Sequence, residues 1–152
     1  MRLRAMTRLG PDLEALVQQS RRYQAELYPA QSIHQDDPQT LLGNGSCFIG
    51  AWEGDGLCGI GAVKIMRDDG CYGEIKNLFV DPRYRGMGVA SAIMGRLERH
   101  LVENRVPLSR LETGTLQPES IELYRGLGYH ERGPFGKYGP DPYSLFMEKS
   151  LR

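Results

Sequence analysis

Apolar residues recur along the chain with two periods, one typical of helices and the other typical of strands. The spacing of Leu13, Leu16 and Val17 predicts a first helix over residues 10–29, because positions three and four apart share one face of a helix. The polar residues from 30 to 40 follow neither period and are left unassigned.

Three runs of strand character follow, Cys47–Trp52, Leu57–Met66 and Cys71–Val80. The connectors between them, Glu53-Gly54-Asp55-Gly56 and Arg67-Asp68-Asp69-Gly70, are short and contain glycine. Connectors of this kind join neighbouring antiparallel strands. The three runs therefore predict an antiparallel meander.

The second half of the chain alternates between the two periods. It predicts a helix from about Gly88 to Asn104, a strand from Ser109 to Thr115, and a helix from Gln117-Pro118 to Gly128. Two more strands are predicted between residues 129 and 149, on either side of a loop rich in Gly and Pro. The strand, helix and strand around residues 74–115 predict a parallel crossover. The whole pattern favours an α/β fold, with one mixed sheet and helices packed against it.

Length and composition favour one globular domain over residues 1–152. The chain has 19 basic and 19 acidic residues, so no overall charge attracts nucleic acid or an anionic membrane. The N-terminal MRLRAMTRLGPD lacks the apolar run of a signal peptide, and there is no stretch of about 18 apolar residues. We expect a cytoplasmic protein that binds neither nucleic acid nor a membrane.

Cysteines and histidines occur without the spacing of metal ligands. Cys47, Cys58 and Cys71 form no CxxC pair and are interpreted as reduced thiols. The histidines lie in no HExxH or similar motif, so no metal is expected. Asn44-Gly45-Ser46 has the form of a glycosylation sequon and is interpreted as a turn.

The segment from Val80 to Ser91 places two glycines and two arginines between a strand and a helix. Backbone N–H groups at a helix start are unpaired and attract anions, and Gly86 and Gly88 let the main chain approach a phosphate. The alternative is a plain turn with solvated arginines. A Walker A loop is excluded because no Lys-Ser/Thr follows the glycines. Gly86-x-Gly88-x-x-Ser91 fits the dinucleotide fingerprint only in part.

Two motifs together resemble the GCN5-related N-acetyltransferase (GNAT) family. The first, Arg83-x-x-Gly86-x-Gly88 after Leu78-Phe79-Val80-Asp81-Pro82, resembles the acyl-CoA loop of that family. The second, Glu119–Tyr129, is similar to its second signature helix. The resemblance covers about residues 47–149. It implies a GNAT-like acyl-CoA N-acyltransferase fold, a central mixed sheet with a splayed, V-shaped cleft flanked by helices.

The resemblance implies that acetyl-CoA is the cofactor, with its pyrophosphate on the amides of Arg85–Ala90 and its pantetheine arm along Leu78–Val80. Such strand-like pairing needs unpaired backbone groups. Ile75–Val80 is therefore expected to diverge from Arg110–Thr115, with a bulge near Asn77 or Leu78. The residues expected to bind acetyl-CoA are Leu78, Phe79, Val80, Arg83, Arg85, Gly86, Met87, Gly88, Val89, Ala90, Ser91 and Tyr124.

Acetyl transfer from a thioester needs a neutral amine and an acid for the leaving thiolate. By resemblance, Tyr124 matches the acid of the family; the alternative is a core aromatic, since it recurs with apolar neighbours at helical spacing. Glu74 resembles the carboxylate that several members use as a base, and the alternative is an exposed strand charge paired with Lys76 or an arginine. Glu112 on the neighbouring strand is a rival base, and a substrate that is already partly neutral needs none.

Substrate contacts are expected from Tyr28, His34 and Glu112, although an exposed loop histidine is the alternative for His34. Gln117 stands where the family commonly has Asn, which leaves a side-chain bond to the pantetheine arm open. We expect an N-acetyltransferase that transfers the acetyl group directly to the primary amine of a small molecule. The alternatives are an acetyltransferase of protein N-termini or lysines, and a non-catalytic acyl-CoA-binding sensor module. Pairing into a homodimer is left open.

Overall fold

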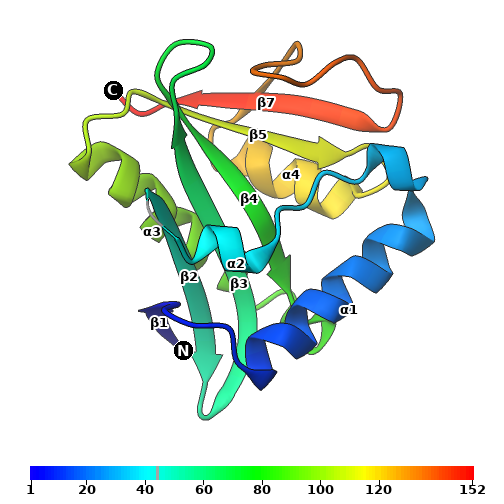
Figure 1. Cartoon of the computed structure of the whole chain (residues 1–152), viewed down its shortest axis with the longest axis vertical. Coiled ribbons are helices and arrows are strands. Elements are labelled where there is room, and N and C mark those ends of the chain that lie inside the picture. Colours follow the sequence, from blue (N-terminus) through cyan, green and yellow to red (C-terminus); the bar gives the residue numbers. More distant parts are fainter. Residues whose placement is uncertain (44) are drawn as a thin grey trace.

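A seven-stranded sheet, in the order β1-β2-β3-β4-β5-β7-β6, forms the centre of the computed structural model (Figure 1). The structure describes residues 1–43 and 45–152, so the turn predicted at Asn44 lies outside the described residues. The strands are β1 (Arg2–Ala5), β2 (Ser46–Glu53), β3 (Gly56–Met66), β4 (Tyr72–Val80), β5 (Leu108–Gly114), β6 (His130–Arg132) and β7 (Ser144–Ser150). The helices are α1 (Pro11–Leu27), α2 (Pro38–Leu41), α3 (Val89–Glu103) and α4 (Pro118–Gly126), with 3-10 turns η1 (Ala30–Ser32) and η2 (Pro82–Tyr84).

The predicted mixed sheet is confirmed. β2, β3 and β4 form an antiparallel meander, and β7 runs antiparallel between β5 and β6. β4 pairs parallel with β5, and α3 is the crossover between them. The parallel pair lies in the middle of the sheet, where the two antiparallel parts meet.

The sequence pattern does not predict β1 or the short helices after α1. β1 has only two apolar residues, and its extended form comes from antiparallel pairing with β2, where Leu3 lies opposite Ala51. α2 spans four residues and depends on a local cap, in which the Gln39 N–H donates to Asp37 Oδ1 at 2.9 Å. β1 thus depends on pairing with another strand and α2 on local capping, and a hydrophobic period reports neither.

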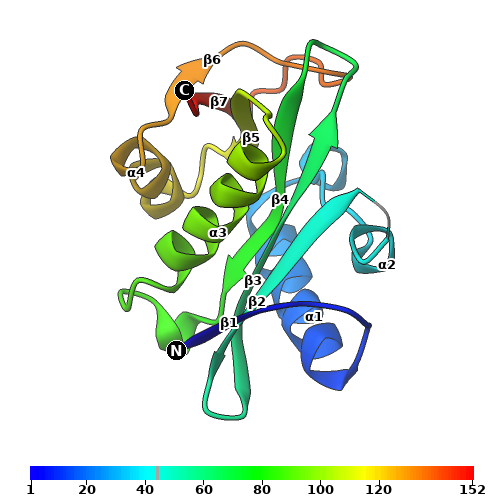
Figure 2. The same cartoon turned by 90° about the vertical axis from the view of Figure 1, so that its left-hand side faces the viewer.

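Helices cover both faces of the sheet, α3 and α4 on one face and α1 and α2 on the other (Figure 2). The apolar face predicted for α3 is fully buried at Ile93, Leu97 and Leu101. α3 lies close to the sheet because the strands beneath it carry glycines. A Cβ on Gly73 would overlap the Leu101 side chain, so this close packing requires glycine there.

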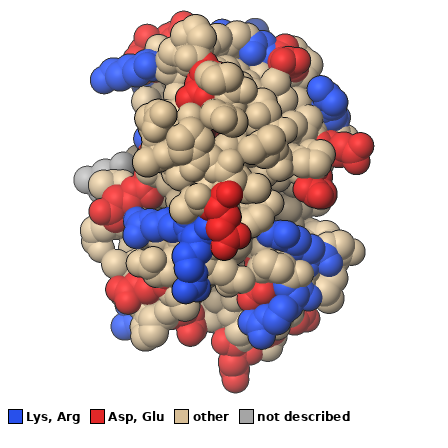
Figure 3. Space-filling view, turned by 90° about the vertical axis from the view of Figure 1, so that its right-hand side faces the viewer, with Lys and Arg blue, Asp and Glu red and all other residues tan. Residues whose placement is uncertain are grey.

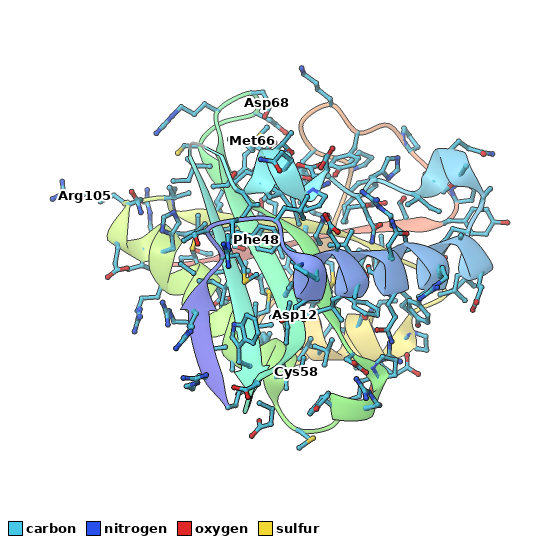
Figure 4. All side chains as sticks on the ribbon, turned by 60° about the horizontal axis from the view of Figure 1, so that its bottom comes forward. Asp12, Phe48, Cys58, Met66, Asp68 and Arg105 are labelled. Carbon is cyan, nitrogen blue, oxygen red and sulfur yellow. The ribbon has the colours of Figure 1, made fainter. Side chains whose placement is uncertain are left out.

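α1 packs its apolar face on the opposite side of the sheet. Leu13 and Leu16 are buried together with Phe48 and Phe79 of the strands. Figure 4 shows Phe48 on β2 and Asp12 in the first turn of α1, where a carboxylate complements the helix dipole. The far end of α1 reaches the gap between β4 and β5, where Gln24 lines a cavity.

β4 and β5 separate after a short paired segment (Figure 1). Their parallel pairing is limited to Gly73 opposite Ser109 and Glu74 opposite Arg110. β4 also has a bulge, because two of its residues between Lys76 and Phe79 oppose one residue of β3, and Asn77 has a positive φ of 55°. The predicted divergence and the predicted bulge are both confirmed.

Candidate active site

The loop between β4 and α3 lines one side of a cavity of about 570 Å³. The end of β4 and the first residues of α4 form the other walls, together with Tyr23 of α1. Ten of the residues expected to bind the cofactor line it: Leu78, Phe79, Val80, Arg85, Gly86, Gly88, Val89, Ala90, Ser91 and Tyr124.

The loop has the backbone form expected of an anion site. Gly86 and Gly88 have positive φ values of 77° and 79°, a conformation that favours glycine. A Cβ at either glycine would meet nothing within 4 Å, so the main chain is open to a ligand. The N–H of Ala92 makes the first bond of α3, to the Gly88 carbonyl. The three N–H groups before it precede the helical ladder and point toward the helix start.

Arg83 and Met87 do not line this cavity. The Arg83 Nη2 lies 2.9 Å from Asp81 Oδ2, and its side chain is 80% exposed. The hydrogen bond from the guanidinium lowers the pKa of Asp81 below its ordinary value. Asp81 also accepts the Arg83 N–H, so the contacts of Arg83 hold η2 together, while Met87 projects into solvent.

β4 is paired on one edge only beside this cavity. Phe79 and Val80 lie opposite Ile60 and Gly59 of β3, and the pairing with β5 ends at Glu74. The other backbone edge of residues 78–80 therefore faces the cleft, as pairing with an extended chain requires.

A second, polar cavity of about 90 Å³ lies in the cleft between β4 and β5. Tyr28, His34 and Glu112 all line it, although they come from three separate parts of the chain. Glu112 Oε2 accepts a hydrogen bond from Ser144 Oγ at 2.6 Å and lies 3.0 Å from His34 Nδ1. His34 is thus a partly buried residue in contact with a carboxylate, and its interpretation as a solvent-exposed loop residue is wrong.

Tyr28 connects α1 to the start of α4. Its hydroxyl donates to Gln117 Oε1 at 3.1 Å and accepts from the Leu116 N–H at 3.1 Å. Burial raises the pKa of Tyr28, so the hydroxyl stays protonated at neutral pH. Gln117 lines both cavities, and its side-chain oxygen is already engaged by Tyr28.

Tyr124 lies where the two cavities meet. Leu78, Gln117, Ser120 and Tyr124 line both of them. The Tyr124 side chain belongs to the main core cluster, and its ring packs edge-on against Tyr129 at 5.9 Å. Burial raises the pKa of Tyr124 well above its ordinary value, so the hydroxyl carries its proton at neutral pH. The side chain is therefore both a packed core aromatic and a wall of the cleft.

Glu74 is buried but lies outside the polar cavity. Its Oε2 accepts a hydrogen bond from Tyr138 OH at 2.6 Å and is 3.7 Å from Lys76 Nζ. It lines a third cavity of about 670 Å³, separated from the polar one by His34, Lys76 and Tyr138, which line both. Glu74 is thus paired with Lys76, as the alternative interpretation expected, but that interpretation also expected an exposed side chain, and this part is wrong. Burial, followed by the charge of Glu74, raises the pKa of Tyr138.

Lys76 and Asp36 are site residues that the sequence analysis missed. Lys76 Nζ donates to the His34 carbonyl at 2.6 Å and lies 3.3 Å from Asp36 Oδ1. Asp36 Oδ2 is 2.6 Å from Lys64 Nζ. Burial opposes ionisation of Asp36, but the hydrogen bond from Lys64 and the charge of Lys76 outweigh it, so its pKa is lowered. Glu74 and Lys76 are two residues apart on β4, so the alternation of strand residues places them on the same face. The sequence therefore contained a signal that could have identified Lys76.

The third cavity lies at one end of the sheet. Met66 and Asp68, which line it, lie at the opposite end of β3 from Cys58 in Figure 4. On the side of the molecule where α1 lies, Figure 3 shows Lys, Arg, Asp and Glu intermingled on the lower part, and on the upper part charges stand mostly around the margin of an uncharged centre.

The described residues show neither a metal site nor a membrane span. Within residues 1–43 and 45–152, no three His, Cys, Asp or Glu side chains are grouped closely enough to hold a metal ion. In the same part of the chain, no helix has the length and apolar character needed to cross a membrane. Cys47, Cys58 and Cys71 are free thiols.

Comparison with known proteins identifies the class to which this fold and cleft belong. The structure is similar to the crystal structure of a candidate acyl-CoA N-acyltransferase from Klebsiella pneumoniae, with a TM-score of 0.81, 28% identity, and coverage of 99% of this chain and 97% of that one. It is also similar to an aminoglycoside 6'-N-acetyltransferase complexed with coenzyme A, with a TM-score of 0.76, 18% identity, and coverage of 100% and 98%. The fold is that of the acyl-CoA N-acyltransferases.

The sequence comparisons identify the family. Residues 12–129 match the Acetyltransferase (GNAT) family. The chain is 43% identical over 136 residues to the IAA acetyltransferase of Azospirillum brasilense, which covers 90% of this chain and 88% of that protein. The chain therefore belongs to the GNAT family of acetyltransferases, and the family resemblance and the enzyme class predicted from the sequence are both confirmed.

Proposed function

We propose that this acetyltransferase uses acetyl-CoA and transfers the acetyl group directly to the primary amine of a small molecule. One observation carries the proposal. The cavity beside the glycine loop and the polar cavity share Leu78, Gln117, Ser120 and Tyr124 as walls. A donor held on one side and an amine held on the other would therefore meet at a single point.

The residues beside the glycine loop fit a coenzyme A. Gly86 and Gly88 leave the main chain open, and the first N–H groups of α3 suit a diphosphate. The free edge of residues 78–80 suits the extended pantetheine arm. The aminoglycoside 6'-N-acetyltransferase with a similar fold was crystallised with coenzyme A, which supports this assignment.

Tyr124 is proposed as the acid that protonates the leaving sulfur. Its hydroxyl carries a proton at neutral pH, because burial raises its pKa, and its side chain lines both cavities. A protonated hydroxyl at the meeting point can donate to a thiolate as the thioester bond breaks. Acetyl-CoA supplies the activated acyl group.

The polar cavity would hold the amine group of the proposed small acceptor. Its volume of about 90 Å³ leaves room for a compact amine group beside Glu112. The larger cavity beyond His34 and Tyr138 provides space for the rest of the acceptor. An enzyme acting on protein N-termini or lysines would need an open groove for a polypeptide.

An amine panel tests the proposal. The purified protein is incubated with acetyl-CoA and with amino acids, aliphatic diamines, polyamines and an aminoglycoside. IAA is included because the relative from Azospirillum brasilense is named for it, and peptides with a free N-terminus or lysine represent the protein alternative. Release of the CoA thiol and the mass of the acetylated product are measured. Product from a small amine supports the proposal, whereas product from peptides alone overturns it. Tight CoA binding without any product favours the sensor alternative.

A further inference from the structure

We propose that His34 takes the proton from the acceptor ammonium, and that Glu112 is the positioning residue that orients the His34 ring. The inference rests on the proposed function and names the base for that reaction. Glu74, predicted from the family resemblance to be the base, lies in a different cavity. The contacts of His34 and Glu112 carry the argument.

The hydrogen bond between the two side chains selects one form of the neutral imidazole. An ionised carboxylate can only accept hydrogen bonds. His34 Nδ1 lies 3.0 Å from Glu112 Oε2, so Nδ1 must carry the hydrogen. The same Oε2 accepts from Ser144 Oγ at 2.6 Å, which holds the carboxylate in place. The ring therefore presents Nε2 with its lone pair free, and within the described residues Nε2 has no hydrogen-bond partner.

His34 also stands at the boundary between two cavities. It lines the polar cavity together with Tyr124, and it lines the larger cavity beyond Tyr138. The side chain is 31% exposed. A proton taken from the amine in the small cavity can therefore be released to water through the large one.

Charged and titratable groups from four segments face His34. Glu112 on β5 lies next to the ring, Lys76 on β4 holds the His34 carbonyl, and Tyr138 packs edge-on at 5.3 Å. Asp141, in the loop before β7, is near enough to His34 for an electrostatic interaction between the two side chains. Asp36 lies in the same segment as His34, and its Oδ1 is 3.3 Å from Lys76 Nζ. Glu112 is thus the carboxylate in direct contact with the ring, and the nearby lysine is itself paired with Asp36.

The two glutamates are less suited to the role. Glu74 Oε2 accepts the Tyr138 hydroxyl at 2.6 Å, and that tyrosine stands between Glu74 and the polar cavity. Glu112 Oε2 already has two partners, Ser144 and His34. The free Nε2 of His34 is therefore the better placed proton acceptor in the polar cavity.

The proposed step balances as follows. The ammonium of the acceptor loses one proton to His34 Nε2, and the imidazolium is stabilised by Glu112. The lone pair of the neutral amine attacks the thioester carbonyl carbon, so that a C–N bond forms and the C–S bond breaks. The sulfur takes a proton from Tyr124, which recovers one from the amine nitrogen. His34 then loses its proton to solvent, and the products are the amide, the free thiol and one proton.

Kinetics of matched glutamine variants test the assignment. With the panel amine of highest kcat/KM, His34→Gln is expected to lower kcat/KM at pH 7 by about 100-fold or more. The KM for acetyl-CoA should stay the same, because His34 does not line the coenzyme cavity. In the variant, log kcat/KM should rise with pH at unit slope, since only free amine reacts, whereas the wild type levels off. Added imidazole should restore activity to His34→Ala. His130→Gln is the matched control, because that side chain is 67% exposed on β6, and it should retain full activity.

Several results would overturn the assignment. One is a kcat/KM in His34→Gln equal to that of the wild type. Another is a lowered kcat/KM whose pH dependence is unchanged and which imidazole does not restore, because that result indicates a structural role for His34. Loss of the pH-dependent limb in Glu74→Gln alone would assign the base to Glu74. Absence of turnover with every amine in the wild type would overturn the proposed function as well, so the two failures differ.

Nitrogen NMR gives a readout that does not depend on activity. In the wild-type protein at high pH, the neutral His34 ring should carry its hydrogen on Nδ1, and a hydrogen on Nε2 would overturn the proposal. In Glu112→Gln the amide can donate as well as accept, so the ring should become a mixture of the two forms. The kcat of that variant should fall about 10-fold, because part of the population then presents an Nε2 that cannot accept a proton and because the imidazolium loses the stabilising charge of Glu112. An unchanged ring and unchanged kcat would remove Glu112 from the positioning role.

Discussion

Two substitutions at Gly86 separate the backbone geometry of the loop from its charge. Gly86 has a φ of 77°, and a Cβ there would meet nothing within 4 Å. Gly86→Ala and Gly86→Glu therefore share the same backbone strain and create no clash. Only the glutamate adds a negative charge where the diphosphate of coenzyme A is proposed to lie.

The sizes of the two effects follow from the geometry. A left-handed conformation costs a residue with a Cβ roughly 1–2 kcal/mol, so both variants should lose about that much stability. Two unit charges about 8 Å apart, at an effective dielectric constant of about 20, repel each other by roughly 2 kcal/mol. Gly86→Glu should therefore bind coenzyme A about 30-fold more weakly than Gly86→Ala.

Urea unfolding measures the loss of stability from backbone strain, and calorimetric titration with coenzyme A measures the loss of affinity from the added charge. The difference between the variants should shrink as salt is added, because exposed charges are screened. Gly95→Ala is the control: Gly95 lies within α3 and its Cβ would also meet nothing. That variant should gain about 0.5–1 kcal/mol of stability and keep its affinity. If Gly86→Glu binds coenzyme A as tightly as Gly86→Ala at low salt, the diphosphate does not lie on this loop.

Three further predictions concern the acid, the charged cluster and the core. Tyr124→Phe should lower kcat by about 100-fold with little change in KM for acetyl-CoA; unchanged kcat in steady-state assays would exclude Tyr124 as the acid. The pKa of Asp36 is lowered in the folded state from 3.8, so its stabilising effect is present above about pH 4 and lost at lower pH. The urea stability of Asp36→Asn should therefore fall less than that of the wild type between pH 7 and 3, and equal losses would contradict this. Leu101→Ala should lower the free energy of unfolding by about 2–5 kcal/mol and Gly73→Ala by about 1–3 kcal/mol. In urea unfolding, the double variant should lose less than the sum of the two, because the new methyl group fills part of the space that leucine leaves.

Elements with a strong period or a local signal were predictable from the sequence. α1 and α4 each begin with a proline in the first turn, and the meander is separated by short connectors with glycine. β1 was not predictable in this way, since it has two arginines among four residues and depends on its pairing with β2. Its position at the edge of the sheet, which only the tertiary structure determines, tolerates such charged side chains.

The backbone form of the loop after β4 was predictable because its information is local. Gly86 and Gly88 both have positive φ angles, which favour glycine, and they lie within three residues of each other. The helix α3 begins at the next residue, Val89. A reader of the sequence can therefore locate the loop without knowing what packs around it. Arg83 was the exception: its guanidinium turns back to Asp81, two residues away, and only the structure distinguishes that contact from one with a ligand.

The acceptor side depends on pairs of residues that are distant in the chain. His34 and Glu112 are 78 positions apart, and Tyr138 contacts Glu74 across 64 positions. The residues of the glycine loop, in contrast, are neighbours in the sequence. The strand period shows that Glu74 shares a face with Lys76, but it does not show that Tyr138 covers that face. Glu74 and its rival Glu112 therefore stay alternatives in the sequence, and the structure separates them because Tyr138, in the loop before β7, covers Glu74. The packing of Tyr138 thus keeps Glu74 out of the polar cavity, which is why the proposed base differs from the one that the family resemblance implies.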